Sequence, residues 1–231
     1  MDVTKPDWSA AAAELDAQGW ALLPRLLDPR ACLEVAALWL EESRFRSRVT
    51  MQRHGFGQGE YRYFAHPLPE LVGQLRAELY PPLAKVADRW REALGRPDPY
   101  PPAHEDYLAR CAAAGQTRPT PLLLRYQAGD YNCLHQDLYG AEAFPLQVAI
   151  LLSRPGEDFT GGEFLLAEQR PRRQSRASVA PLEQGDAVAF AVGERPVRGS
   201  RGVYRTRMKH GVSTIRFGER FTLGVIFHDA L

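Results

Sequence analysis

The sequence predicts an α+β fold, with helices in the first half of the chain and an antiparallel sandwich or barrel in the second. Two observations support this prediction. Residues 8–115 hold long segments in which apolar side chains recur at helical spacing. From residue 121 onward the segments are short, most are rich in β-branched or aromatic residues, and Gly, Pro and Asp separate them.

The helical segments begin and end at residues with clear local chemistry. The first ends at Gly19, and the second opens with Asp28 as a candidate N-cap. The third contains Pro81 and Pro82, which we expect to break or restart it, because proline lacks the backbone N–H that a helix interior needs. The predicted helical segments are 8–19, 28–42, 69–95 and 104–115.

The strand-like segments of the second half are predicted to form the core. Because the helices need a sheet against which to bury their apolar faces, we expect one domain over residues 1–231. In it, 1–117 form a mainly helical support layer and 118–231 the core. The predicted strand segments are 121–130, 131–138, 144–152, 161–168, 186–192, 202–212 and 220–227, with 21–27 as a further candidate.

The composition is that of an ordinary globular protein and argues against several functional classes. The formal net charge is only +1, so any binding of polyanions must come from local patches. Cys32, Cys111 and Cys133 form no C-x-x-C pair, which argues against a disulfide framework and a cysteine zinc site. We see no signal peptide and no apolar run long enough to span a membrane, and therefore expect a cytoplasmic protein.

A histidine and an aspartate lie two residues apart in YNCLHQDL. If this segment is extended, His135 and Asp137 point to the same face, because side chains alternate along a strand. They would supply two ligands of a 2-His-1-carboxylate site, which holds non-haem Fe(II) and leaves positions open. An H-x-D pair alone is more often structural. Of the six histidines, His210 is the best placed third ligand, late in the β-rich half with a strand on each side.

The last predicted strand carries an arginine in an unusual setting. Arg220 and Thr222 share one of its faces, together with Gly224 and Ile226. A guanidinium inside a β core is unfavourable unless a carboxylate pairs with it. The planar fork of arginine suits bidentate capture of a carboxylate. A small dicarboxylate bound beside the metal would supply that partner.

Taken together, these motifs resemble those of the Fe(II)- and 2-oxoglutarate-dependent oxygenases, which have a double-stranded β-helix (jelly-roll) core. RYQAGD before the first ligand and FTGGEFLL after it are similar to the prolyl-hydroxylase-like branch. The resemblance covers roughly residues 118–229, and the helical first half fits the support layer of that branch. The matching motif residues, in chain order, are His135, Asp137, His210, Arg220 and Thr222.

The resemblance implies a role for each of these residues. The two histidines and the aspartate would bind Fe(II). Arg220 would hold the distal carboxylate of 2-oxoglutarate, and Thr222 would hydrogen-bond to it. Tyr126 matches a position whose tyrosine often contacts the same cosubstrate, although an ordinary core tyrosine explains it equally well. Arg216 is a rival for the carboxylate, but its spacing from His210 fits the branch less well. With O2, decarboxylation of 2-oxoglutarate to succinate would drive hydroxylation of a substrate C–H bond.

The substrate is left open by the sequence. The branch resemblance favours a protein side chain or a free amino acid. Two Arg-rich loops, 170–176 and 195–209, could instead grip phosphates, which favours oxidative dealkylation of a nucleobase; a salt-bridged surface would also explain them. Residues 54–64 are either a substrate-covering loop or a plain connection. Gln147 either lines the site or is a bonded core residue, and Tyr139 begins the loop that leaves the metal.

A different class of function is a cupin-like jelly-roll protein that binds metal or hydrolyses a substrate without 2-oxoglutarate. Two histidines and an aspartate can also hold zinc with an open position. Arg220 discriminates between the two classes, because such a protein has no need of a buried carboxylate clamp.

Overall fold

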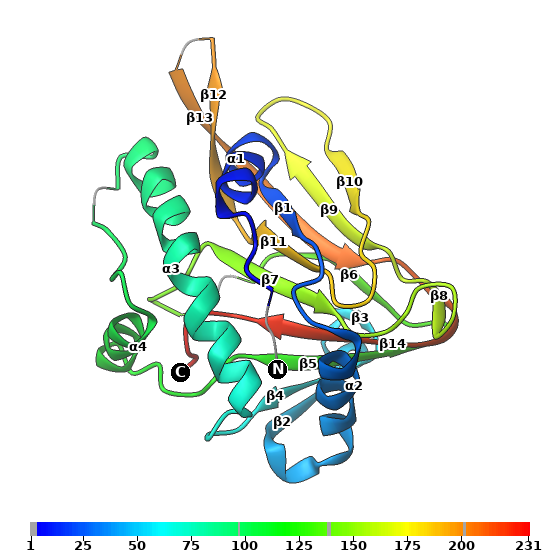
Figure 1. Cartoon of the computed structure of the whole chain (residues 1–231). Coiled ribbons are helices and arrows are strands. Elements are labelled where there is room, and N and C mark those ends of the chain that lie inside the picture. Colours follow the sequence, from blue (N-terminus) through cyan, green and yellow to red (C-terminus); the bar gives the residue numbers. More distant parts are fainter. Residues whose placement is uncertain (1–3, 97, 138–139, 201) are drawn as a thin grey trace.

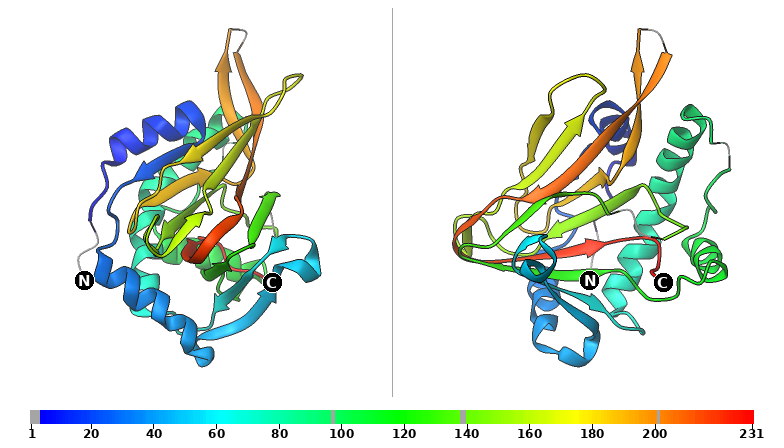
Figure 2. Two further views of the ribbon diagram at one scale, coloured as in Figure 1. Left: turned by 90° about the vertical axis from the view of Figure 1, so that its right-hand side faces the viewer. Right: turned by 180° about the vertical axis from the view of Figure 1, so that it is seen from behind.

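The computed structural model describes residues 4–96, 98–137, 140–200 and 202–231. Its core consists of two antiparallel sheets that face each other (Figures 1 and 2). The larger sheet has the spatial order β1 (Trp20–Leu23), β11 (Ala187–Ala191), β7 (Leu146–Leu151), β14 (Ile215–Val225), β5 (Leu122–Gln127), β4 (Glu60–Phe64) and β2 (Phe45–Thr50), and β8 (Phe159–Gly161) pairs with β14.

The smaller sheet faces the larger one and carries the long hairpin of the molecule. In Figure 1 this hairpin, formed by β12 and β13, projects beyond the remaining elements. The spatial order is β10 (Arg176–Ala180), β9 (Phe164–Gln169), β13 (Gly202–Val212), β6 (Tyr131–His135) and β3 (Gly57–Gln58), and β12 (Glu194–Gly199) pairs with β13.

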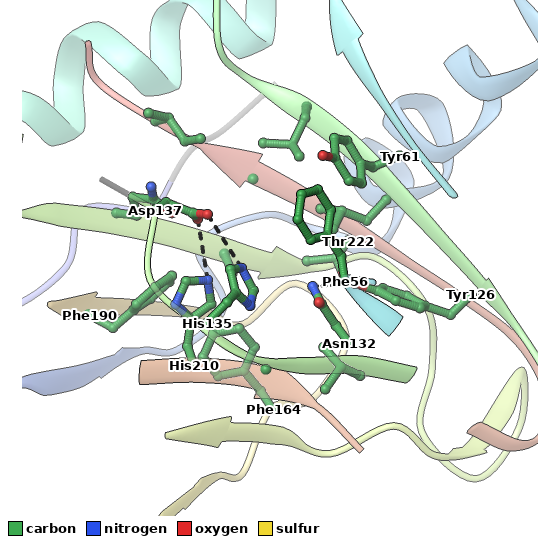
Figure 3. Close-up of a pocket in the computed structure, with 18 of the residues that line it drawn as sticks. Phe56, Tyr61, Tyr126, Asn132, His135, Asp137, Phe164, Phe190, His210 and Thr222 are labelled. Atoms are coloured by element: carbon green, nitrogen blue, oxygen red, sulfur yellow. Dashed lines mark hydrogen bonds and ion pairs between the residues drawn. The ribbon is translucent and has the colours of Figure 1, made fainter. Parts of the chain in front are cut away.

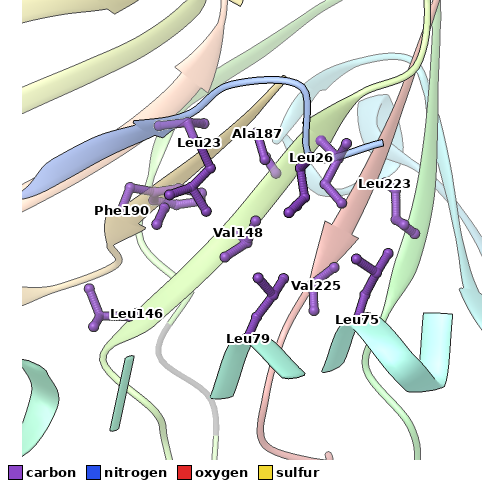
Figure 4. Close-up of a cluster of buried hydrophobic side chains, with 14 of the residues drawn as sticks. Leu23, Leu26, Leu75, Leu79, Leu146, Val148, Ala187, Phe190, Leu223 and Val225 are labelled. Atoms are coloured by element: carbon purple, nitrogen blue, oxygen red, sulfur yellow. The ribbon is translucent and has the colours of Figure 1, made fainter. Parts of the chain in front are cut away.

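Helices cover the outer face of the larger sheet. Leu75 and Leu79 of α3 pack against Val148 of β7 and Leu223 and Val225 of β14 (Figure 4). This packing orients β14, because its alternate residues must then face the space between the sheets. The helices are α1 (Trp8–Gln18), α2 (Pro29–Ala37), α3 (Glu70–Ala93) and α4 (His104–Ala113), with short 3-10 helices η1 (Leu38–Leu40), η2 (Glu42–Arg44) and η3 (Met51–His54).

The predicted break at the double proline is wrong. The α3 helix continues through Pro81 and Pro82 to Ala93. Each proline in a helix interior costs about 3 kcal/mol. The residues on either side, Tyr80 and Leu83, are fully buried, and the burial of the whole helix face against the sheet outweighs this local cost.

The first 117 residues supply strands to both sheets as well as helices. The predicted segment at 21–27 contains β1, whereas β2, β3 and β4 carry no clear strand signal in the sequence. The segment 54–64, expected as a substrate-covering loop or a plain connection, ends in β4. This strand pairs with β5, and β5 pairs with β14, which carries Arg220. Its residues alternate between charged and aromatic types, which obscures the pattern of a half-buried strand.

Candidate active site

The two histidines of the predicted metal site face each other across neighbouring strands. His135 is the last residue of β6, and its register partner on β13 is His210. The centres of the two imidazole rings lie 4.2 Å apart. Asp137 follows just after the end of β6 rather than inside a strand, and its carboxylate points toward both rings (Figure 3).

The three side chains form a compact set of donor atoms. The Nε2 atom of His135 lies 3.4 Å from Asp137 Oδ1, and the Nε2 atom of His210 lies 3.4 Å from Asp137 Oδ2. One donor atom from each residue falls within 4.8 Å of the others. Two imidazole nitrogens and one carboxylate oxygen at this spacing can hold one ion with open positions for further ligands.

Neighbouring backbone groups hold the ligands in place. The Nδ1 atom of His135 lies 2.8 Å from the Cys133 carbonyl oxygen, which directs Nε2 of the same ring toward the aspartate. The Gln136 amide donates to the Met208 carbonyl at 2.9 Å and ties the segment after β6 to β13. Cys133 itself, two residues before His135 on β6, is exposed.

The aspartate is ionised in this setting. Burial alone raises the pKa of the Asp137 carboxyl, but contacts with the two imidazoles outweigh burial and hold this pKa well below its ordinary range. Burial lowers the pKa of His210, which favours the neutral imidazole that metal ligation requires. The Nδ1 atom of His210 is buried without a hydrogen-bond partner among the described residues.

Arg220 is a buried cation in the same pocket. It is 1% exposed, and its guanidinium forms no ion pair with any described residue. Nη1 donates to Thr222 Oγ1 at 2.5 Å, while Nε has no partner. Burial lowers the pKa of Arg220 to about 10, because Tyr126 and Glu163 only partly compensate for lost hydration. A carboxylate is the chemical group that best complements a buried guanidinium in this state.

Two neighbours define the space around this guanidinium. Tyr126 is fully buried, its ring lies 5.7 Å from the Arg220 guanidinium carbon, and its hydroxyl accepts from Asn132 at 3.3 Å. Gly162 has a φ of +65°, and a Cβ atom there would lie 2.9 Å from Cδ of Arg220. Glycine therefore leaves room for the arginine stem to reach the pocket. The rival Arg216 instead points to the surface, where it pairs with Glu163 at 3.5 Å.

The remaining pocket wall is mainly aromatic and apolar. Phe56, Tyr61 and Tyr63 from the segment 54–64 line it, with Phe164 and Phe190 beside His210. Figure 3 shows Phe56 and Tyr61 across the pocket from the metal ligands. The sequence offered only a glycine- and aromatic-rich segment as a signal for this wall. Gln147 also lines the pocket, whereas Tyr139 lies outside the described residues.

Only the first of the two predicted Arg-rich loops is a loop, since residues 170–175 connect β9 to β10. Residues 195–209 are not a loop, because most of them belong to the β12–β13 hairpin. Arg195 is fully buried and pairs with Glu168 at 2.6 Å, and Arg170 pairs with the same carboxylate at 3.0 Å, so neither is free for phosphate. Arg201 lies outside the described residues. Within residues 170–176 and 195–209, the exposed cations without an ion pair to a described residue, here called the basic surface, are Arg172, Arg173, Arg176, Arg198, Arg207 and Lys209.

Comparison with known proteins identifies the family. Residues 59–230 match the model of the Oxygenase-NA family, described as an oxygenase catalysing oxidative methylation of damaged DNA. The chain belongs to this oxygenase family. It is also 53% identical over 167 residues to the uncharacterized protein Rv2227 of Mycobacterium tuberculosis strain H37Rv, a match that covers 72% of each chain.

Solved structures share the fold. A member of the 2OG-Fe(II) oxygenase family from Burkholderia pseudomallei is 17% identical with a TM-score of 0.56, over 100% of this chain and 95% of that one. A prolyl-4-hydroxylase from Pseudomonas putida is 14% identical with a TM-score of 0.53, over 96% and 100%. The fold confirms the predicted jelly-roll core, and the family confirms that the protein is an oxygenase. Fe(II), 2-oxoglutarate and O2 as its cofactors stay a prediction.

No helix in the described part of the chain has the length and apolar character needed to cross a membrane. The expected cytoplasmic location stays a prediction.

Proposed function

We propose that this enzyme binds Fe(II) through His135, Asp137 and His210, binds 2-oxoglutarate through Arg220, and removes alkyl groups from nucleobases. The observation that carries the proposal is the coexistence of two incomplete sites in one pocket. One is a set of three metal-donor atoms within 4.8 Å, and the other is a buried guanidinium without an ion pair to a described residue.

The metal donors fit a divalent iron ion. Asp137 supplies a negative charge that offsets part of the charge of the ion, and both histidines offer Nε2 toward the same point. Three ligands leave positions for a bidentate cosubstrate and for oxygen, as in other 2-His-1-carboxylate sites. The hydrogen bond from His135 to the Cys133 carbonyl fixes the ring in the tautomer that ligation requires.

The cosubstrate is held at its far carboxylate by Arg220. The guanidinium has an Nε–H group that no described residue accepts, and Thr222 places a hydroxyl beside Nη1. Tyr126 closes the wall next to the guanidinium. This buried clamp also argues against the cupin-like alternative, since a metal protein that does not use a dicarboxylate would leave Arg220 uncompensated.

The bound iron, with 2-oxoglutarate and O2, supplies the chemistry that inserts oxygen into a C–H bond. On an N-methyl group of a base, the product is an N-hydroxymethyl group, which breaks its C–N bond to release formaldehyde and the unmodified base. The other oxygen atom enters succinate as carbon dioxide leaves. Oxidation therefore removes a methyl group, and we propose demethylation as the chemical meaning of the family description.

The substrate class is supported by the family description and by the basic surface. Arg207 and Lys209 of this surface lie on β13, and Arg198 lies on the paired strand β12. Arg176 begins β10, and the other two arginines lie in the turn before it. On β13, Arg207 and Lys209 alternate with the buried Met208 and His210, so these two cations lie on the outer face of the smaller sheet, opposite the metal donors. Arginines without an ion pair on an exposed strand face suit contacts with phosphates, which are anionic and repeat along a nucleic-acid strand.

The test is an anaerobic loading of purified protein with Fe(II), followed by 2-oxoglutarate, O2 and a methylated single-stranded oligonucleotide. We expect succinate and formaldehyde in equal amounts. A proline-containing peptide serves as the second arm. Oxidation of the peptide but not of the oligonucleotide would contradict the nucleobase assignment, and absence of any succinate would contradict the oxygenase assignment at this site.

Binding of the same oligonucleotide across salt concentrations tests the basic surface. Each phosphate contact contributes about 0.7 to the slope of log affinity against log salt for single strands. We expect the combined variant Arg198→Gln and Arg207→Gln to reduce that slope by about 1.4. The exchange of Arg25 for Gln, an exposed arginine in the β1–α2 connection outside the basic surface, is the matched control. An unchanged slope in the double variant would remove the hairpin from the proposed contact.

A further inference from the structure

Gln147 is a polar residue in an otherwise apolar strand. It is the second residue of β7, whose residues are all buried, and it is itself 5% exposed. Its Nε2 atom is buried and finds no hydrogen-bond partner among the described residues, yet the side chain lines the active-site pocket. An unsatisfied buried amide is costly in a folded protein, which makes it a candidate for a group that a ligand completes.

The position of Gln147 separates it from the 2-oxoglutarate clamp. Its register partner on β11 is Phe190, whose ring centre lies 4.6 Å from that of His210, so the amide lies beside the metal ligands. Thr222, next to Arg220 in the clamp, pairs with Leu151. Leu151 is four residues from Gln147 along β7, which corresponds to roughly 13 Å along the strand. The backbone position of the amide is therefore displaced along the strand from the clamp, toward the metal donors.

The wall that completes this end of the pocket is aromatic. Phe56 is 40% exposed at the pocket edge, and the rings of Tyr61 and Tyr63 meet edge to face at 5.5 Å. Flat side chains of this kind stack on planar heterocycles, whatever the sequence, and contribute about 1–3 kcal/mol for each base. A primary amide recognises the edge of a base, because it can donate to a ring nitrogen or carbonyl and accept from an amino group.

From these features we infer that Gln147 and the aromatic wall formed by Phe56 and Tyr61 make a nucleobase subsite. Gln147 Nε2 donates to an acceptor on the edge of the base, and the aromatic wall covers the face of its ring. The subsite holds the alkylated base out of its strand with the alkyl group toward the metal ligands. This inference rests on the proposed function, since it identifies what the same pocket binds beside the cosubstrate.

The experiment compares wild-type protein with Gln147→Leu, which keeps the size of the side chain and removes the donor. The substrates are single-stranded DNA oligonucleotides with one N-methylated adenine or one N-methylated cytosine. We expect KM for at least one of them to rise about 10-fold, the loss of one hydrogen bond to a buried partner. The 2-oxoglutarate affinity stays within about two-fold of wild type, because the clamp is untouched.

Two further variants separate recognition from folding. Gln74→Leu, on the exposed face of α3, is the matched control and should leave every value unchanged. Phe56→Leu keeps apolar bulk but removes the flat ring, and we expect it to raise KM about 5-fold or more, in line with one stacking contact. Gln147→Leu should be at least as resistant to urea as wild type, since it removes an unsatisfied buried donor.

The outcomes distinguish this inference from the proposed function. If wild type oxidises the oligonucleotide and Gln147→Leu does so with the same KM, Gln147 does not read the base and the inference is overturned. A parallel loss of 2-oxoglutarate affinity in Gln147→Leu would place the residue in the cosubstrate site, against the inference. Failure of wild type to oxidise either oligonucleotide while it still forms succinate would overturn both the nucleobase substrate and its subsite.

Discussion

Two buried regions of this protein treat an arginine in opposite ways. In the contact between α3 and the C-terminal segment, Arg76 donates to Asp229 at 2.7 Å and to the carbonyls of Ile226 and His228. In the pocket, Arg220 is equally buried but has only a threonine hydroxyl and no acid among the described residues. The first arginine has an acid partner and backbone acceptors within the protein, although its Nη1 atom has no partner among the described residues; the second has no ion pair to a described residue.

This difference separates structural from functional burial of charge. A buried ion pair that is supported by further hydrogen bonds holds two segments in one geometry, and removal of one partner is strongly destabilising. A buried cation without a partner lowers the stability of the protein and persists only because a ligand gains from it. Arg195, paired with Glu168 at 2.6 Å, belongs with Arg76.

The largest effect is expected where the ion pair is complete. Arg76→Met leaves Asp229 buried at 6% exposure without its cation and removes three further hydrogen bonds, so we expect a loss of about 3–5 kcal/mol in the free energy of unfolding. Urea denaturation of the metal-free protein measures it. A loss below about 1 kcal/mol would mean that the Arg76–Asp229 pair does not hold these two segments together, and the comparison would fail.

Exchange of the other arginine should have the opposite sign. Arg220→Met removes an uncompensated charge from the pocket, so we expect the metal-free protein without 2-oxoglutarate to be as stable as wild type or more stable by up to about 2 kcal/mol. The same urea experiment measures it. Destabilisation of the size expected for Arg76→Met would show that Arg220 has a structural partner and would weaken its assignment to a ligand.

Acid should destabilise the contact between α3 and the C-terminal segment. Burial lowers the pKa of His104, and likewise that of His228, to about 4, with nearby Arg76 contributing in the same direction. Because these folded-state values lie below the ordinary value of 6.5, the stability is fully present above pH 6.5 and is lost as the pH falls toward 4. Each group accounts for at most about 3 kcal/mol.

The variant His104→Gln, which keeps a donor for the Phe227 carbonyl, should show a shallower loss of stability over the same pH range. Thermal unfolding at half-unit steps of pH measures this slope. A chelator is present, so that the loss of bound metal does not contribute to it. An identical slope in the variant would show that protonation of His104 is not part of the acid response.

The smallest effect is expected at the edge of the clamp. Tyr126→Phe removes a hydroxyl that accepts from Asn132 at 3.3 Å, without altering the ring beside Arg220. We expect 2-oxoglutarate affinity to fall by about 3- to 10-fold, the range of one hydrogen bond. A loss as large as that of Arg220→Met would make the hydroxyl a second principal contact with the cosubstrate.

Much of the core could be predicted from the sequence, because its signals are local. Apolar alternation places Arg220 and Thr222 on the inner face of β14, and the short strand segments of the second half all become strands. The position of Asp137 beyond the end of β6 was missed, because strand ends depend on tertiary pairing. The continuity of α3 through Pro81 was missed for the same reason, since local propensity was outweighed by burial.

The aromatic wall was beyond prediction from one sequence. Phe56 and Tyr61 come from a segment of the first half whose pairing with β5 and β6 is set by contacts distant in the chain. The state of each arginine was equally hidden. Arg195 and Arg207 stand in one basic run, yet the first is fully buried against Glu168 and the second is exposed. Only the three-dimensional structure shows which arginines form internal ion pairs and which are exposed and able to bind a ligand.

The most direct test is a calorimetric titration of 2-oxoglutarate into the anaerobic Fe(II)-loaded protein. Wild type is compared with Arg220→Met and with Arg216→Met, whose arginine is 72% exposed by side chain and paired with Glu163. We predict that Arg220→Met weakens binding about 100-fold or more, the value of a lost charge-assisted pair, while Arg216→Met binds as wild type does. Wild-type affinity in Arg220→Met, or a loss confined to Arg216→Met, would contradict the account.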